Sequence, residues 1–367
     1  MTSQRLRSGY TTGACATAAA KGAALMLREG QIADEVEITL PRGEKVRFTL
    51  GGQRFSVDEA ACFVVKNAGD DPDVTNGAEV HVTVSFSDRG EEGGVIISGG
   101  TGIGRVTKPG LAVAPGAWAI NPVPRRMITE TVLSVFAGMK PAPAIHCLIN
   151  IPNGEELARK TLNARLGIVG GLSILGTTGI VRPVSSQAWT DTIDAAISVA
   201  LACGSDTAVL STGRTSEMAA QKILRAGAEA AGRLKSLPEE AFVMMGDHVG
   251  HALRECVRKG VKRAVLAGQF AKLVKIACGH EQTHVSSSDL DLKQLHGWLS
   301  VSPYSSRLVR CMHNAVTARG VLETSGNDYD LIELVCQRAT RYAESIAPGL
   351  KVKVLLAGYN GEVLYFK

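Results

Sequence analysis

The sequence predicts a two-domain protein that combines the α+β and α/β classes. At 367 residues the chain exceeds what one ordinary core holds. Its first half mixes helical and alternating patterns, whereas from about residue 185 apolar strands alternate with helices, as in a parallel sheet with helices on both faces. We therefore expect an N-terminal α+β sandwich-like domain over residues 1–184, followed by a Rossmann-like α/β domain over residues 185–367.

The first half contains both helix and strand patterns. An alanine-rich stretch predicts a first helix, and the Arg42-Gly43 turn predicts a hairpin. The elements expected here are a helix over Ala14–Arg28, strands Val36–Leu40 and Lys45–Leu50, a helix over Val57–Asn67, strands Glu79–Phe86, Val95–Ser98 and Ala144–Ile151, and a helix after Arg126.

The second half repeats a strand-then-helix pattern. Four of its predicted strands are followed by glycine, and ligands in open α/β sheets bind at the carboxyl ends of the strands. A cleft floor is therefore expected there, although a glycine can also simply start a turn. The expected elements are a helix to Cys203, strands Thr207–Leu210, Phe242–Met245, Arg263–Ala267 and Lys351–Leu356, helices near Glu217–Arg233 and Val249–Arg258, and glycines 213, 246, 268 and 358.

The segment STGRTSE follows the first of these strands. It places Thr212, Gly213, Ser216 and Glu217 at a helix N-terminus, where free amides and the helix dipole favour an anion such as a carboxylate. A capping box is the alternative, and both can hold together. Asp247, after the next strand, is placed to accept hydrogen bonds from ribose hydroxyls, or else to cap the following helix.

The segment from Ser98 to Met127 is long, rich in glycine and proline, and free of acidic residues. Loops of this length are usually functional or disordered. Apolar residues such as Trp118 and Ile120 favour an ordered binding loop over a linker. Its glycines would let backbone amides approach a ligand. We expect an anionic ligand, held by Arg105, Lys108, Arg125 and Arg126.

A second glycine-rich, acid-free stretch runs from Leu166 to Pro183. We expect it to join the two domains and to form a wall for a large flat ligand, because pockets often occur between domains. The polar residues of this stretch and its flank are Arg165, Thr177, Thr178 and Arg182.

Two further features of the first half bear on ligand binding. Thr11 and Thr12 begin a predicted helix, so a carboxylate could dock there and the pKa of Cys15 could be lowered; plain N-capping is the alternative. In AGDDPDVTNG, Asp71 and Asp73 lie in a turn with Asp70. These carboxylates could orient a cation or take a proton, and turn chemistry explains them as well.

Composition narrows the class of protein. A net charge of +5, with acids and bases intermixed, gives no nucleic-acid footprint. Eight cysteines without a CxxC pair suit a reducing cytosol. The chain shows no leader-type N-terminus and no apolar run of about eighteen residues, so we expect a soluble, cytoplasmic protein without membrane contact.

Two enzyme motifs are present only in outline. His280-Glu281-Gln282-Thr283-His284 spells the HExxH of zinc hydrolases, but the flanking glycine and serines indicate the end of a helix, so this is a remote alternative. GGTGIGR departs from the dinucleotide-binding G-x-G-x-x-G at Arg105, and no helix follows promptly.

Several long motifs together resemble the cobalt-precorrin-5B C(1)-methyltransferase family (CbiD), and the resemblance covers nearly the whole chain. They are RSGYTTGACA, AGDDPDVTNG, GGTGIGRVTKPGL, AINPVPRRMI, LNARLGIVGGLSILGTTGIVRP, STGRTSE and the GH-x-x-TH pair near His280. The family is similar in its two-domain arrangement, and in it the residue after the first histidine of that pair need not be acidic, so Glu281 looks incidental.

The resemblance implies transfer of a methyl group from S-adenosyl-L-methionine to ring carbon 1 of a cobalt-corrin precursor during cobalamin biosynthesis. The partner is then a polycarboxylate small molecule, with transient contact with other pathway enzymes, and no resident metal is expected. A non-catalytic tetrapyrrole carrier is the competing class. We expect the cofactor at Thr212, Gly213, Ser216, Glu217, Asp247 and Gly268, the macrocycle at Thr11, Thr12, Arg105, Lys108, Arg125, Arg126, Arg165, Thr177, Thr178 and Arg182, and a proton acceptor in Asp71 or Asp73.

Overall fold

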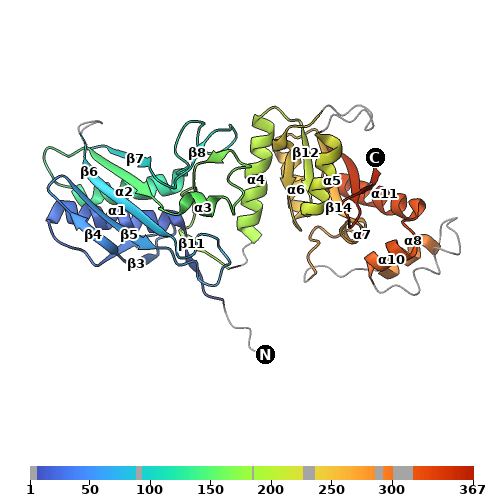
Figure 1. Cartoon of the computed structure of the whole chain (residues 1–367), viewed down its shortest axis with the longest axis horizontal. Helices are drawn as coiled ribbons and strands as arrows, with labels where there is room; N and C mark the ends of the chain where they lie inside the picture. Colours follow the sequence, from blue (N-terminus) through green and yellow to red (C-terminus); the bar gives the residue numbers. More distant parts are fainter. Residues whose placement is uncertain (1–5, 88–92, 184–185, 226–235, 286–291, 301–316) are drawn as a thin grey trace. The chain divides into compact units, whose positions relative to one another are not determined.

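The computed structural model describes residues 6–87, 93–183, 186–225, 236–285, 292–300 and 317–367. The chain divides into two compact units, Met1–Ser185 and Ser186–Lys367, and each has its own hydrophobic core. Each unit contains both helices and sheets (Figure 1), so the mixed α/β class expected from the sequence is confirmed. No described helix combines the length and apolar character needed to cross a membrane.

The N-terminal unit is built on a five-stranded sheet. Its strand order is β4-β5-β6-β9-β7, antiparallel throughout except for the parallel pair β7 and β9. A separate hairpin joins β2 and β3. The bounds are β2 (Glu35–Thr39), β3 (Lys45–Thr49), β4 (Gly51–Phe55), β5 (Glu59–Val65), β6 (Glu79–Phe86), β7 (Val95–Gly99) and β9 (Ile145–Asn150).

Two helices cover one face of this sheet. The first, α1 (Thr12–Glu29), packs against β5, β6 and the second helix, α2 (Pro122–Phe136). Most of α1 is buried on every side, which its many alanines permit because small side chains let neighbouring backbones come close. The valines of β6 at positions 80, 82 and 84 point into the same core, as strand alternation requires.

The prediction of a helix over Val57–Asn67 is wrong. Residues Glu59–Val65 form strand β5, in which Ala60, Cys62 and Val64 point into the core while Phe63 is only partly buried. Pairing with β6 along its whole length outweighs the weak helical pattern of these residues. The helix expected after Arg126 begins earlier, at Pro122, where a missing N–H costs nothing.

The two glycine-rich stretches lie side by side within the N-terminal unit. In one ladder β8 (Arg105–Val106) pairs with β10 (Ile168–Val169), and bridges at Ile103–Leu172 and Ile120–Ile174 continue the contact. The first stretch is therefore ordered, as expected. The second stretch belongs to the N-terminal unit: it pairs with the first, and its end, β11 (Ile180–Val181), pairs with β1 (Gly9–Tyr10).

The C-terminal unit has a five-stranded sheet of order β13-β12-β14-β15-β16, in which the first four strands are parallel and the last is antiparallel. The bounds are β12 (Thr207–Ser211), β13 (Phe242–Met244), β14 (Arg263–Gln269), β15 (Lys351–Ala357) and β16 (Val363–Phe366). The four strands predicted for this half are thereby confirmed, with ends that differ by one or two residues.

Helices cover both faces of this sheet. One core holds side chains of α4 (Ser186–Ala202), α6 (Val249–Lys259), α7 (Phe270–Ala277) and α11 (Tyr329–Ile346). The other holds those of α5 (Arg214–Leu224), which packs against β12, β14 and β15. The predicted extension of α5 to Arg233 falls partly outside the described residues. The shorter helices are α3 (Gly154–Ala158), η2 (Glu239–Ala241), α8 (Leu292–Ser300) and α10 (Ala318–Thr324).

Candidate active site

Three sequence motifs of the N-terminal unit meet at the N-terminus of α1. The amide of Tyr10 donates to the carbonyl of Asn67 at 2.8 Å, and the amide of Thr11 donates to the carbonyl of Gly179 at 3.0 Å. The segments RSGYTT, AGDDPD and GTTGIV are therefore neighbours, although they are separated by up to 170 residues of sequence. This α1 N-terminal cluster gathers Thr11, Thr12, Thr177, Thr178 and the aspartate turn.

The N-terminus of α1 is capped by the chain itself. The hydroxyl of Thr11 accepts from the amide of Ala14 at 3.2 Å, and the amide of Gly13 donates to the carbonyl of Leu175 at 3.0 Å. The hydroxyl of Thr12 accepts from the amide of Leu175 at 3.1 Å. The structure therefore confirms the alternative that Thr11 is the N-cap residue of α1. The expectation that these amides are open to a substrate carboxylate is corrected.

The expectation of a lowered pKa for Cys15 is wrong. Its thiol is fully buried in the first turn of α1, and burial raises the pKa to about 12. The nearby charge of Lys66 acts in the opposite direction but does not compensate. Cys15 is therefore a core residue without nucleophilic character.

Asp73 forms an ion pair that sequence reasoning missed. The ammonium of Lys66, whose side chain is 1% exposed, donates to Asp73 Oδ2 at 2.6 Å, and Thr75 donates to Oδ1 from its amide and its hydroxyl. Burial alone would raise the pKa of the Asp73 carboxyl, but these hydrogen bonds outweigh burial and lower it. Asp73 is thus a poor proton acceptor, and this role is corrected.

The other two aspartates of the turn differ from Asp73. Asp70 is exposed and accepts from the backbone amide of Arg7 at 2.6 Å, and this bond is the main reason that its pKa is lowered. Asp71 is half-buried in the same turn. Of the two predicted proton acceptors, Asp71 is the one that the structure leaves as a prediction.

Three predicted substrate-binding cations lie around the β8–β10 ladder. The guanidinium of Arg105 lies 3.9 Å from the ring centre of Trp118 and donates to the carbonyl of Gly116 at 2.7 Å. The aliphatic part of Lys108 packs over Gly167, two residues beyond Arg165. Arg105 and Lys108 are thus placed beside this ladder by residues far from them in the sequence.

The paired arginines at the start of α2 have different surroundings. Arg125 is half-buried and donates to the carbonyl of Ile97 at 3.3 Å, and burial lowers its pKa. Arg126 is exposed and lies 4.0 Å from Glu130. Of these two arginines, Arg126 is the more exposed. Of the predicted polar residues in the second stretch, Thr177 and Arg182 are exposed, while the hydroxyl of Thr178 is bonded to Ile180.

The glycines of the first stretch serve packing, not approach to a ligand. A β-carbon on Gly102 would lie 1.9 Å from the carbonyl oxygen of Ile151, and one on Gly104 would lie 2.4 Å from the side chain of Ile168. One on Gly100 would meet Asn150 at 2.2 Å. Protein atoms fill the space beside each of these glycines, so the predicted role in ligand approach is corrected.

In the C-terminal unit, the carboxyl ends of β12, β13 and β14 meet at one edge of the sheet. Beyond β12, the amide of Thr212 donates to Ala267 at 3.0 Å, and the carbonyl of Ser211 accepts from Met245 at 3.0 Å. Since β13 lies on one side of β12, and β14 with β15 on the other, the strand order reverses here. Such switch points are where open α/β sheets bind ligands.

This edge carries an unpaired polar atom. The hydroxyl of Ser211 is fully buried and has no hydrogen-bond partner among the described residues. Gly213 precedes α5 in extended conformation, and a β-carbon there would meet nothing within 4 Å. Ser216 donates to the carbonyl of Gly213 at 2.9 Å, and Glu217 is buried in the same turn. Sequence reasoning missed Ser211, although it opens the STGRTSE motif.

Asp247 is anchored by two residues that sequence reasoning did not single out. Lys272 and the hydroxyl of Thr283, the latter at 2.6 Å, both bond to its Oδ1. Burial would raise the pKa of Asp247, but these bonds outweigh burial and lower it. His248, not Asp247, occupies the N-cap position of α6, so the capping alternative is wrong.

The HExxH pattern does not form a zinc site. Residues 280–285 are not helical, so the two histidines do not share a helical face. Glu281 forms a bidentate ion pair with Arg254, and Gln282 bonds to His248 at 2.7 Å. Within the described ranges, no group of three or more metal-ligating side chains is found. The zinc-hydrolase alternative is therefore wrong on geometry.

Comparison with known proteins gives matches along the chain. The family model described as CbiD matches residues 1–183, and that described as CbiD, C-terminal domain, matches residues 282–367. Proteins named cobalt-precorrin-5B C(1)-methyltransferase from Geotalea daltonii and Geobacter sulfurreducens are 61% and 62% identical, covering 100% of both chains. The one from Priestia megaterium is 41% identical over 98% of this chain and 96% of the relative.

A solved structure is also similar. It is the 1.9 Å crystal structure of a cobalamin biosynthesis protein (cbiD) from Archaeoglobus fulgidus, with 28% sequence identity, coverage of 74% of this chain and 79% of that chain, and a TM-score of 0.40.

Proposed function

The chain belongs to the CbiD family, and from this premise we propose that it methylates ring carbon 1 of cobalt-precorrin-5B in cobalamin biosynthesis, with S-adenosyl-L-methionine as the methyl donor. The observation that carries this conclusion is end-to-end identity of 61–62% to relatives named for that reaction. The protein is thus an enzyme, a C-methyltransferase, and its substrate is a cobalt-corrin small molecule.

We propose that the two units bind different ligands. We assign cofactor binding to residues 185–367 and substrate binding to residues 1–184. The strand order, the four parallel strands and the helices on both faces support a Rossmann-like arrangement of the C-terminal unit. The exposed Arg105, beside the β8–β10 ladder, and the exposed Arg126 and Arg182 support the substrate assignment.

The carboxyl edge of the C-terminal sheet fits S-adenosyl-L-methionine. The buried hydroxyl of Ser211 has no hydrogen-bond partner among the described residues, and Ser211 ends the strand that precedes α5. The first amides of α5 have no partner within the helix. The open space beside Gly213 leaves room for a carboxylate at that helix end. The carboxylate of Asp247 can accept a hydrogen bond from a ribose hydroxyl. The bound cofactor supplies an electrophilic methyl group on a sulfonium sulfur.

The substrate carries acetate and propionate arms, so it is held by several cations. One exposed ion pair contributes only about 0–1 kcal/mol. Hydrogen bonds to charged groups contribute about 1.5–3 kcal/mol each once water is excluded. A set of contacts is therefore needed. We propose Arg105, Lys108, Arg126, Arg165, Thr177 and Arg182 for this role, with Arg125, Thr11, Thr12 and Thr178 supporting the backbone that presents them.

We propose that the residues of this chain act mainly by positioning the substrate and the cofactor. The ring carbon attacks the methyl carbon, a C–C bond forms as the S–CH3 bond breaks, and the thioether S-adenosylhomocysteine leaves with the electron pair. Since no protein nucleophile is needed, acceleration comes from holding the reacting atoms close and excluding water. Cys15, the cysteine at the N-terminus of α1, is not a candidate nucleophile because burial raises its pKa. We propose Asp71 as the group that accepts any proton released.

Methyl transfer from labelled cofactor tests this function. Purified protein is incubated with cobalt-precorrin-5B and methyl-labelled S-adenosyl-L-methionine, and the label is located by NMR. The expected result is one labelled methyl at ring carbon 1. Recovery of unlabelled, unchanged corrinoid that nevertheless co-purifies with the protein would instead identify the carrier alternative.

A further inference from the structure

Trp189 lies beside the carboxyl edge and is not among the proposed contacts. It lies in the first turns of α4, yet its indole N–H donates to the carbonyl of Met245, at the end of β13, at 3.0 Å. This bond fixes the ring beside the strand end that precedes Asp247. The side chain is nevertheless 43% exposed, which is unusual for so large an apolar ring with a satisfied N–H.

Gly246 and His248 lie next to the indole ring of Trp189. Gly246 has φ of +58°, and a β-carbon there would lie 3.1 Å from the Trp189 ring, so only glycine fits. The ring of His248 lies 24° from the indole plane, with centroids 6.4 Å apart. His248 is in turn held by Gln282 at 2.7 Å, and burial lowers its pKa.

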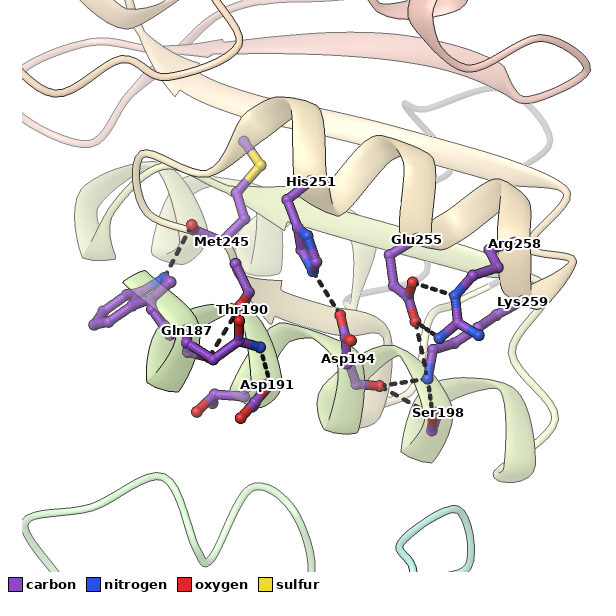
Figure 2. A network of polar contacts seen from close by, with 12 residues as sticks. Gln187, Thr190, Asp191, Asp194, Ser198, Met245, His251, Glu255, Arg258 and Lys259 are labelled. Atoms are coloured by element: carbon purple, nitrogen blue, oxygen red, sulfur yellow. Dashed lines mark hydrogen bonds and ion pairs between the residues drawn. The ribbon is translucent and has the colours of Figure 1, made fainter. Parts of the chain in front are cut away.

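The helix that carries Trp189 is firmly attached. Figure 2 shows α4 lying along α6, with Asp194 directed at His251 and with Ser198 and Lys259 in contact farther along. The Asp194–His251 bond is 2.7 Å, and Lys259 also donates to the backbone carbonyl of residue 194 at 2.9 Å. These links hold α4 in place, so the indole is pre-organised and need not be ordered on binding.

A fixed, half-exposed aromatic ring whose N–H already has its hydrogen bond offers its face to a flat heteroaromatic ligand. We propose that Trp189 is the stacking platform for the adenine ring of the S-adenosyl cofactor, an inference that rests on the proposed function. Asp247, which follows Gly246 directly, is then at the ribose, and the α5 end at β12 is left for the amino-acid portion. Two of these contact points follow the adjacent strands β12 and β13, and Trp189, on α4, is bonded to Met245 directly after β13.

The platform has a matched control within the chain. The three tryptophans are Trp118, Trp189 and Trp298. Trp298 belongs to α8 and takes no part in the proposed site; the guanidinium of Arg338 lies 4.3 Å from its ring centre. Comparing Trp189→Phe with Trp298→Phe therefore distinguishes quenching of Trp189 by the ligand from a general change in tryptophan fluorescence.

The test is a titration of the full chain with S-adenosylhomocysteine, followed by calorimetry and by tryptophan fluorescence. We expect quenching in the wild type and in Trp298→Phe, and its loss in Trp189→Phe. Affinity should fall about tenfold in Trp189→Ala, as expected for loss of one base–aromatic stack, and should be largely retained in Trp189→Phe. Circular dichroism and thermal unfolding verify that each variant is folded.

Failure of this inference differs from failure of the proposed function. Equal affinities in wild type and Trp189→Ala, with quenching that persists in Trp189→Phe, would overturn the platform while leaving the cofactor assignment intact. Absence of any S-adenosylhomocysteine binding to the wild type would overturn both.

Discussion

Lys66 is among the most deeply buried charged side chains of the described chain, and its ammonium depends on Asp73 for compensation. A buried ion pair adds little stability relative to an apolar pair, but removing one partner leaves an uncompensated charge. The pair therefore fixes the aspartate turn next to the N-terminus of α1 more than it stabilises the unit.

We expect Asp73→Asn to lower the free energy of unfolding by about 3 kcal/mol, because it strands the Lys66 ammonium in the core. The double variant Lys66→Met/Asp73→Asn should recover most of this loss, since no buried charge remains. Urea unfolding measures both. An additive, larger loss in the double variant would contradict the account.

The carboxylate of Asp247 predicts a pH dependence. Lys272 and Thr283 outweigh burial and lower its pKa in the folded protein, so its contribution to stability is present above the unfolded pKa of about 3.9 and is lost as pH falls through the folded value. Unfolding curves of the wild type and Asp247→Asn, without ligand, should therefore differ at pH 6–7 and converge below about pH 4. A constant difference down to pH 3 would argue against the anchored carboxylate.

The sequence predicted several residues of the candidate site, but it did not predict which side chains form hydrogen bonds with them. The STGRTSE motif indicated a helix N-terminus, and the structure has one at Gly213. The anchoring of Asp247 required Lys272 and Thr283, which lie 25 and 36 residues away, and no local pattern announces such a meeting. For Cys15 the local rule for helix N-termini favoured a low pKa, and burial in the tertiary core reversed it.

At the scale of elements, the glycine-rich ladder between β8 and β10 is held by close backbone packing. A β-carbon on Gly171 would lie 2.2 Å from the carbonyl oxygen of Gly102. We expect Gly171→Ala to cost roughly 1–3 kcal/mol of unfolding free energy by overpacking. Gly297→Ala, in α8, meets no neighbour and should be neutral or slightly stabilising. A neutral Gly171→Ala measured by the same urea titration would reject the packing role.

Elements with strict alternation or a repeated strand–helix pattern were predictable, and elements set by their neighbours were not. The valine alternation of β6 and the βα repeats after residue 185 gave the right strands. β5 was mistaken for a helix because EAACFVV fits both periods, and only its pairing with β6 decides. The short pairings of β1 with β11 and β8 with β10 join residues about 60 to 170 positions apart, which no local signal reports.

At the scale of the whole molecule, the two units have separate cores, and no core cluster of the described residues includes side chains of both. Residues 186–367 expressed alone should therefore unfold cooperatively in urea, as residues 1–185 should. Circular dichroism across the titration measures this. A gradual, non-cooperative loss of structure in either fragment would show that the unit needs the rest of the chain.

The central claim is that the C-terminal unit binds the cofactor at its sheet edge while the N-terminal unit binds the corrin. Hydrogen exchange of the full chain, read by mass spectrometry, tests it most directly. S-adenosylhomocysteine should slow exchange around residues 211–217 and 245–250 and leave residues 100–126 unchanged, whereas the corrin substrate should slow exchange in residues 100–126 and 165–182. Protection of the N-terminal segments by S-adenosylhomocysteine alone, with residues 211–217 unaffected, would contradict the account.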